Sequence, residues 1–305
     1  MHSVTAPRKA VLSAGLLVLA ITVVVGKASC APATPFRLTL KRSDSVGATQ
    51  SIRIHTVRKT ILRLNGVATG PATVDYLEVT ADCTARTLAV NANGTSSRDE
   101  IKLGPLLFRT DPTGPFQTAS CSGTVIEHNC SVGIPFVRKD GLPISDAEVA
   151  ALKSVFGQHA DERHPSNDDV FGTTKLVRAG DTWSGHNAVL AKEASKLFRA
   201  QIAPTSVSSW VKVNGTQVVG SVECVDVSTH VTISNLHRSP GFASMHANNV
   251  EMTTDDRTLY PKNPKMPSLA SRSVNHFLII KTDSKGRREM DEEESTEINP
   301  IAPVE

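Results

Sequence analysis

Four side chains of the types that bind metal ions fall within residues 159–164, in the sequence HADERH. Imidazole and carboxylate groups are common ligands of zinc and similar ions. Gly157 favours the end of the preceding helix and Pro165 prevents its continuation, so the segment does not present one helical face. Because the spacing matches no established ligand pattern, a solvated linker is the simpler interpretation and a metal site is the alternative. The candidate ligands are His159, Asp161, Glu162 and His164.

Acid–base and nucleophilic chemistry find little support in the sequence. Asp255 and Asp256 are adjacent carboxylates that could exchange protons with a substrate, but TTDDRT is also a common surface turn. His128 precedes Cys130 by two residues, a spacing that is ordinary on a strand. The G-x-S-x-G, H-E-x-x-H, G-x-G-x-x-G and Walker-type motifs are missing from the sequence. A non-enzymatic protein is therefore favoured, and no cofactor is predicted.

The segment 171–187, FGTTKLVRAGDTWSGHN, is a third candidate for chemistry. It groups Gly180, Asp181, Trp183 and His186 in a chain that has only 2 tryptophans. Glycine and aspartate are typical of turns, because one allows unusual φ angles and the other bonds its own backbone. A tryptophan that follows such a turn is most simply a buried ring. The segment is interpreted as a structural corner, with the rim of an active site as the alternative.

The 5 cysteines are not arranged as a C-x-x-C redox or zinc motif. Cys30 lies at the presumed processing site. In an exported chain the other four are candidates for disulfide bonds, and four cysteines allow three connectivities. Buried free thiols are the alternative. The disulfide candidates are Cys83, Cys121, Cys130 and Cys224.

The N-terminus has the layout of a secretory signal peptide. Arg8 and Lys9 precede the uncharged apolar run 10–25, and small residues follow. A transmembrane anchor needs about 20 apolar residues, so this run is short for one. The KASC sequence ends like a lipoprotein signal, although Lys27 stands where an aliphatic residue is expected. Lipidation of Cys30 and simple cleavage nearby are both open, and we expect a protein exported to the periplasm or cell envelope.

The charge of the chain changes when the leader is set aside. The whole sequence has 33 basic and 30 acidic residues, but Arg8, Lys9 and Lys27 belong to the leader. The remaining 30 basic residues balance the 30 acidic ones. A neutral chain lacks the field that dominates nucleic-acid affinity, and aromatic residues for base stacking make up only 4%. Nucleic acid is therefore not expected as a partner. Contact with the membrane is expected only through the leader or through a lipid on Cys30.

Period-two alternation of apolar and polar residues predicts a β-rich protein. Strands are expected at 36–40, 52–56 and 275–283, and a short one in ANNVEMTT at 247–254. The segment 208–225 is predicted to be a β-hairpin that turns at Asn214-Gly215, because this dipeptide tolerates positive φ angles. The fold class is α+β dominated by antiparallel β-sheet, with two β-rich halves and one or two short helices between them.

Two helices interrupt the strands. The segment from Ser145 begins with a capping box, since Glu148 follows three residues later, and its apolar residues recur at three-to-four spacing. A weaker helix begins at Asn187. The predicted parts are a signal peptide at 1–30, a β-rich half at 31–142, a helix and polar linker at 143–167, a second β-rich half at 168–288, and an acidic tail or last edge strand at 289–305. If 289–305 forms a strand, it pairs in a hairpin that turns at DSKGR.

The pattern of FG at 171–172 followed by V-x-x-G-D-x-W at 177–183 resembles exported bacterial proteins of unknown function, many with lipoprotein-type signals. The resemblance extends over about 140–235 and includes DGLPIS before the first helix. It departs at Lys27 and in the helix after Trp183. The resemblance implies a β-rich envelope protein and no particular activity.

Two classes of function remain after these exclusions. The favoured one is a non-catalytic binding or structural role in the cell envelope, with a lipid, a peptide or an envelope protein as partner. The alternative is an exported hydrolase or metal-dependent enzyme that uses His, Asp and Glu residues of 159–169 or 237–260. Fold alone does not decide between them, because function depends on sites.

Overall fold

The computed structural model describes most of the chain after residue 33. The described residues are 34–42, 44–68, 75–91, 94, 96–129, 136–156, 165–198, 200–236, 247–284 and 286–301. The predicted signal peptide, Cys30, Cys130 and the metal candidates at 159–164 lie outside these residues.

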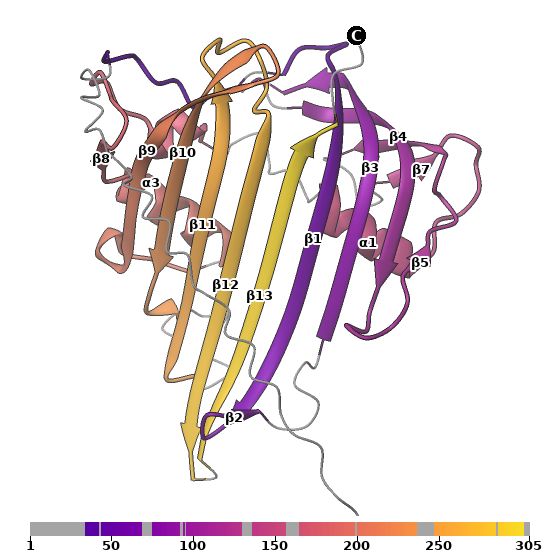
Figure 1. Ribbon diagram of the computed structural model, residues 1–305. Coiled ribbons are helices and arrows are strands. Elements are labelled where there is room, and N and C mark those ends of the chain that lie inside the picture. The colour runs from indigo at the N-terminus through magenta and orange to yellow at the C-terminus, as the bar shows by residue number, and fades with distance from the viewer. Residues whose placement is uncertain are drawn as a thin grey trace, which may run out of the picture. The chain divides into compact units, whose positions relative to one another are not determined.

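One antiparallel sheet of 13 strands dominates the described residues (Figure 1), which confirms the predicted fold class. The strand order is β7-β6-β4-β3-β1-β13-β12-β11-β10-β9-β8, with β2 beside β1 and β5 beside β4. The strands are β1 Thr49–Leu64, β2 Val67–Ala68, β3 Asp75–Val90, β4 Ser96–Arg109, β5 Gln117–Thr118, β6 Val125–Asn129, β7 Phe136–Arg138, β8 Thr182–Trp183, β9 Val207–Val219, β10 Val222–Ile233, β11 Asn249–Pro261, β12 Ala270–Asp283 and β13 Gly286–Pro300. The α-helices are α1 Asp146–Phe156, α2 Asn167–Phe171 and α3 Asn187–Leu197.

The last strand, β13, lies in the middle of this sheet. It pairs with β12 through a hairpin and with β1 from the opposite end of the sequence. The hairpin turn at 283–286 is where DSKGR predicted it, but the structure differs from the expected acidic tail or edge strand. Acidic residues of β13 lie beside basic residues of β1, as in the register pair Lys59 and Glu293, so pairing on both sides is favourable. The ranges 31–142 and 168–288 therefore contribute to one continuous sheet.

The helices α1 and α3 lie on the same face of the sheet. Ile54 belongs to the apolar cluster around α1 and Ile279 to the cluster around α3. Their partners on β13 are Ile298 and Met290, which are eight residues apart and so point to the same side. Figure 1 shows both helices behind the strands. These two apolar clusters thus lie on one face, which we call the helix face, and a third cluster, around Leu40, Val211 and Val227, lies on the same face.

The other face of the sheet, which we call the open face, carries alternating charges. Among the described residues no helix packs on it. Ion pairs connect neighbouring strands there, including Lys59–Glu293 at 3.0 Å and Arg63–Asp291 at 2.7 Å between β1 and β13. Strands with one apolar and one polar face are what period-two alternation predicts.

The two predicted helices are confirmed as α1 and α3. The predicted capping box is present at α1: the Ser145 backbone N–H donates to Glu148 Oε2 at 3.0 Å, and the Glu148 N–H donates to Ser145 Oγ at 3.4 Å. The short helix α2 was not predicted. It has its own capping box, formed by Ser166 and Asp169.

Two local predictions are wrong. The hairpin of β9 and β10 exists, but it turns at Gly220, where φ is 62°, rather than at Asn214-Gly215. The Asn214-Gly215 dipeptide forms a β-bulge, where Asn214 Nδ2 donates to Asp226 and Ser228 and keeps the strands paired beyond it. The segment 36–40 is not a strand; its ladder contact is one bridge between Phe36 and Val177.

Candidate functional site

The acid–base candidates Asp255 and Asp256 do not form a pair in the structure. Asp255 and Asp256 are neighbours on β11, so their side chains point to opposite faces. Asp255 pairs with His230 on the open face at 2.7 Å. Burial on the helix face raises the pKa of Asp256. No group of three or more His, Cys, Asp or Glu suited to a metal occurs within the described ranges.

The cysteines that the structure describes lie in buried environments that make their thiols unreactive. Cys83, Cys121 and Cys224 are buried, and the structure shows each as a free thiol. Burial raises the pKa of Cys83 to about 12, and burial also raises the pKa of Cys121 and of Cys224. Thiols with raised pKa values are poor nucleophiles. The predicted disulfide bonds among these cysteines are therefore not present in the structure, and Cys130 lies outside the described residues.

The segment 171–187 forms a packed corner, as its structural interpretation predicted. Gly180 has φ of 91°, and the Asp181 carboxylate accepts the backbone N–H of Arg178 at 2.8 Å. The indole N–H of Trp183 donates to the Phe171 carbonyl at 2.8 Å. The turn and the half-buried ring place this segment against β9.

A cavity of about 340 Å³ lies beside the C-terminal end of α1. One wall comes from α1 and the other from the helix face of β1, β3, β4 and β13. These elements are expected to supply apolar side chains, because the strands alternate with period two and the helix with period 3.6. The apolar lining is Ala48, Ile52, Ile54, Ala85, Ile101, Val155, Phe156, Pro267 and Ile298.

Polar groups also line the same cavity. Ser96 is their centre: its backbone N–H donates to the Asp44 carboxylate at 2.7 Å, and its hydroxyl donates to Asp99 at 2.6 Å. Lys265 supplies one positive charge to the lining. Two carboxylates against one ammonium make this part of the lining net negative. We call Asp44, Ser96, Asp99 and Lys265 the polar end of the cavity.

His128 closes the cavity from the strand side. Only 1% of its surface is exposed, and its ring stacks on Phe136 at 4.7 Å between centroids. Phe136 in turn lies 6.3 Å from Phe156, which ends α1. Stacked rings hold side chains in fixed orientations, so this corner of the cavity is a rigid wall.

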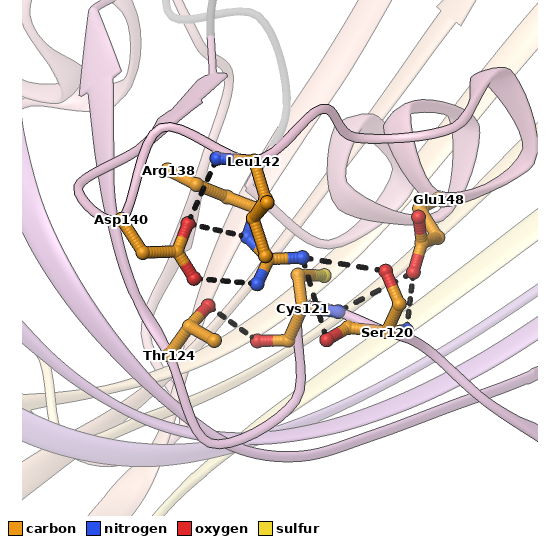
Figure 2. Close-up of polar contacts among 7 residues, drawn as sticks. All are labelled: Ser120, Cys121, Thr124, Arg138, Asp140, Leu142 and Glu148. Carbon is orange, nitrogen blue, oxygen red and sulfur yellow. Dashed lines mark hydrogen bonds and ion pairs between the residues drawn. The ribbon is translucent and has the colours of Figure 1, made fainter.

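Glu148 fixes the opposite end of α1 (Figure 2). One carboxylate oxygen accepts the Ser145 backbone N–H and hydroxyl. The other accepts the N–H groups of Ser120 and Cys121, as Figure 2 shows. Burial alone would raise the pKa of Glu148, but the donors of Ser145 and Ser120 lower it to about 2. The buried carboxylate thus stays charged and ties the helix to the 119–124 loop.

Arg138 of β7 holds the same loop from its other side. Its guanidinium forms two bonds to Asp140 at 2.9 and 2.6 Å and reaches the Ser120 carbonyl at 3.4 Å. Asp140 also accepts the N–H of Leu142 at 3.1 Å. These contacts set the chain before α1 and therefore the placement of Val155 and Phe156 over the cavity.

The arrangement is suited to binding. A rigid cavity with apolar walls and a few convergent polar groups is typical of small-ligand sites. The apolar residues of the strands and helices were predicted to be core residues, and most of them are. The sequence did not indicate that Ile52, Val155 and Phe156 also line a cavity. Period-two and helical patterns show which residues face inward, whereas the fit between two elements depends on their placement.

Within the described residues, none of the helices is both long and apolar enough to span a bilayer.

Comparisons with known proteins identify no family. No family model matches the sequence, and no curated protein does. A solved structure titled "Lipid-protein interactions in lipovitellin" aligns over 86% of this chain at 10% identity, with a TM-score of 0.35. The alignment spans 27% of that chain. A "Crystal structure of MucB in complex with MucA(peri)" aligns over 82% of this chain and 94% of its own, at 9% identity and a TM-score of 0.11. Both scores are too low to establish a shared fold.

Proposed function

We propose that the protein is a non-catalytic binding protein of the cell envelope, and that it holds a single-chain amphiphile in the cavity beside α1. The apolar chain packs against Ile52, Ile101 and Phe156, and the head group meets the polar end. The observation that supports this assignment is the combination of apolar walls and clustered polar groups in one cavity of about 340 Å³.

Burial of the chain supplies most of the affinity. Each methylene removed from water contributes about 0.8 kcal/mol. The volume is within the range of about 300–1,000 Å³ that is usual for small-ligand sites, which favours one chain over a two-chain lipid. The fixed placement of α1 by Glu148 limits the loss of conformational freedom on binding.

The charge of the polar end selects the head group. The lining holds the carboxylates of Asp44 and Asp99 and one ammonium, that of Lys265, so an anionic head would meet net repulsion. The Asp99 carboxylate accepts from the Ser96 hydroxyl, and a carboxylate can accept more than one hydrogen bond. A neutral hydroxylated head or a cationic head is therefore favoured over a carboxylate such as that of a fatty acid.

The proposed location is the periplasm or cell envelope. The basic, apolar and small-residue layout of 1–30 supports export. The resemblance of about 140–235 to exported bacterial proteins supports the same location. In this setting the protein takes up amphiphiles from the aqueous phase or from a membrane surface.

The test measures binding of three dodecyl compounds to the mature chain below their micelle concentrations. Calorimetry with dodecyltrimethylammonium, dodecyl maltoside and dodecanoate is expected to show binding of the first two and at least about tenfold weaker binding of the third. Failure of both favoured probes to bind overturns the proposal, and preference for dodecanoate overturns the head-group assignment.

A cavity-filling variant locates the site. Ala85→Leu adds bulk to the lining of the cavity and is expected to weaken binding at least about tenfold. Ala89→Leu makes the same change on β3 outside the lining and is the matched control. Equal affinities for the two variants would place the amphiphile elsewhere.

A further inference from the structure

A second cavity, of about 480 Å³, lies at the corner that 171–187 builds. Three segments contribute its lining, with residues 37–39, residues 172–175, and Trp183, Ser184 and His186, and Asp168 of α2 also lines it. None of these residues lines the cavity beside α1. The second cavity is therefore independent of the proposed amphiphile site.

Two basic side chains from separate segments line this second cavity. Arg37 and Lys175 are both exposed, and neither has an ion-pair partner in the part of the chain that the structure describes. The acidic residue of the lining, Asp168, accepts the Leu40 backbone N–H at 2.6 Å through one carboxylate oxygen. The lining thus carries net positive charge, which favours an anion.

His186 adds a hydrogen-bonding group with a defined orientation. Its Nδ1 donates to the Asp169 carbonyl at 2.5 Å, because a carbonyl oxygen only accepts. This bond leaves Nε2 as an acceptor in the neutral ring and as a second donor when the ring is protonated. The imidazole is exposed and lines the cavity, so Nε2 is free to reach a ligand hydroxyl or an anion.

Hydroxyl groups and one aromatic ring complete the lining. The hydroxyl side chains are those of Thr39, Thr173, Thr174 and Ser184. Trp183 is half-buried, and its N–H bond to Phe171 fixes the ring. A fixed aromatic ring beside several hydroxyls suits a polyhydroxylated ring, which presents C–H groups to the aromatic face and O–H groups to the polar partners.

Two glycines shape the walls of this cavity. A Cβ on Gly172 would lie 2.2 Å from the Asp168 carbonyl oxygen, and a Cβ on Gly185 would lie 2.7 Å from Ser209 Oγ. Both segments therefore approach their neighbours more closely than any side chain allows. The FG and SG pairs of 171–187 thus have a structural reason.

We propose that this second cavity binds an anionic sugar, a saccharide that carries a carboxylate or phosphate group. Arg37 and Lys175 bind the anionic group, the hydroxyl side chains and His186 bind the ring hydroxyls, and Trp183 contacts the ring. The motif 171–187 then serves both as a corner of the fold and as a binding surface.

The test uses the fluorescence of Trp183 in the full mature chain. The chain has 2 tryptophans, and Trp210 lies on β9 with 40% of its surface exposed. Trp210→Phe therefore leaves Trp183 as the single reporter. Glucuronate and glucose 6-phosphate are expected to change its emission saturably at millimolar concentrations or below, and glucose to bind at least about tenfold more weakly.

Charge-removing variants decide whether the cavity is the site. Arg37→Gln and Lys175→Gln are each expected to weaken binding of both anionic sugars about tenfold. Arg178→Gln removes an exposed charge outside the lining and is expected to leave affinity unchanged. Absence of binding by both sugars, or equal affinities in all three variants, overturns the proposal. If inorganic phosphate binds as tightly as glucose 6-phosphate, the sugar assignment is wrong.

Discussion

At the scale of single residues, Glu148 shows how a buried charge organises a helix. Its carboxylate accepts from backbone and side-chain donors of two segments, and these bonds outweigh the cost of burial, so its pKa falls to about 2. The sequence predicted the local part of this arrangement, which is the capping box that Glu148 forms with Ser145. Ser120 and Cys121 are 28 and 27 residues away from Glu148 in the sequence, so no local sequence pattern indicates these bonds.

The first prediction concerns this carboxylate. The unfolded pKa of glutamate is about 4.3, and the folded value is lower, so its stabilisation is present above pH of about 4.3 and is lost as pH falls towards 2. Glu148→Gln is expected to reduce the free energy of unfolding by roughly 3 kcal/mol at pH 7 and by much less at pH 2.5. Urea unfolding at both pH values measures this difference.

Asp146→Asn is the matched control for Glu148. Asp146 is exposed in the first turn of the same helix, where a carboxylate contributes about 0.3–1 kcal/mol through the helix dipole. An equal loss for Glu148→Gln at pH 7 and pH 2.5 would show that the charge of Glu148 does not stabilise the fold.

At the scale of elements, two turns at one end of the sheet are joined by a close contact. The Asn65 side chain in the β1–β2 turn accepts the Arg287 N–H at 2.8 Å, and the Asn65 N–H donates to the Arg287 carbonyl at 2.7 Å. Gly286 begins β13 with φ of 115°, and a Cβ there would lie 2.6 Å from Asn65 Oδ1. The contact requires glycine for two reasons, conformation and space.

The second prediction compares two glycines with positive φ. Gly286→Ala is expected to lower the free energy of unfolding by roughly 2–3 kcal/mol, since it adds a clash to a strained backbone. Gly47→Ala, with φ of 88° and no atom within 4 Å of the added Cβ, is expected to cost about 1 kcal/mol from conformation alone. Equal losses in urea unfolding would show that the Asn65 contact is unimportant.

At the scale of the whole molecule, the C-terminal strand joins the two sides of the sheet. β13 pairs with β1 over Ile52–Leu64 and with β12 over Ser271–Asp283. Without β13 both neighbours would present unpaired edges, which are costly and prone to aggregation. The acidic C-terminal segment therefore has a structural role, although its composition is typical of a solvated tail.

The third prediction follows from this position. A chain that ends at Ser284 lacks β13 and is expected to lose cooperative unfolding and to aggregate, as followed by circular dichroism and size-exclusion chromatography. A chain that ends at Ile301 keeps β13 and is expected to retain a cooperative transition. If the shorter chain unfolds within a few degrees of the full one, the central pairing of β13 is incorrect.

The sequence by itself determined the features that depend on neighbours along the chain. Period-two alternation predicted the antiparallel sheet, three-to-four spacing predicted α1 and α3, and the Ser145–Glu148 pattern predicted a cap. The predicted position of the β9–β10 turn was wrong. Asn214-Gly215 forms a bulge instead, because Asp226 and Ser228 accept hydrogen bonds from Asn214 across the strands. Here a contact with the next strand outweighed a local preference.

Only the tertiary structure decided which distant segments meet. The pairing of β13 with β1, and the two cavities, each depend on residues more than a hundred positions apart. Arg37 and Lys175 show no relation in sequence but line one cavity; Asp44 and Lys265 line the other. Local patterns specify which face of each strand or helix is apolar, but strand register and the gaps between packed elements arise from long-range pairing and packing, which have no local signal.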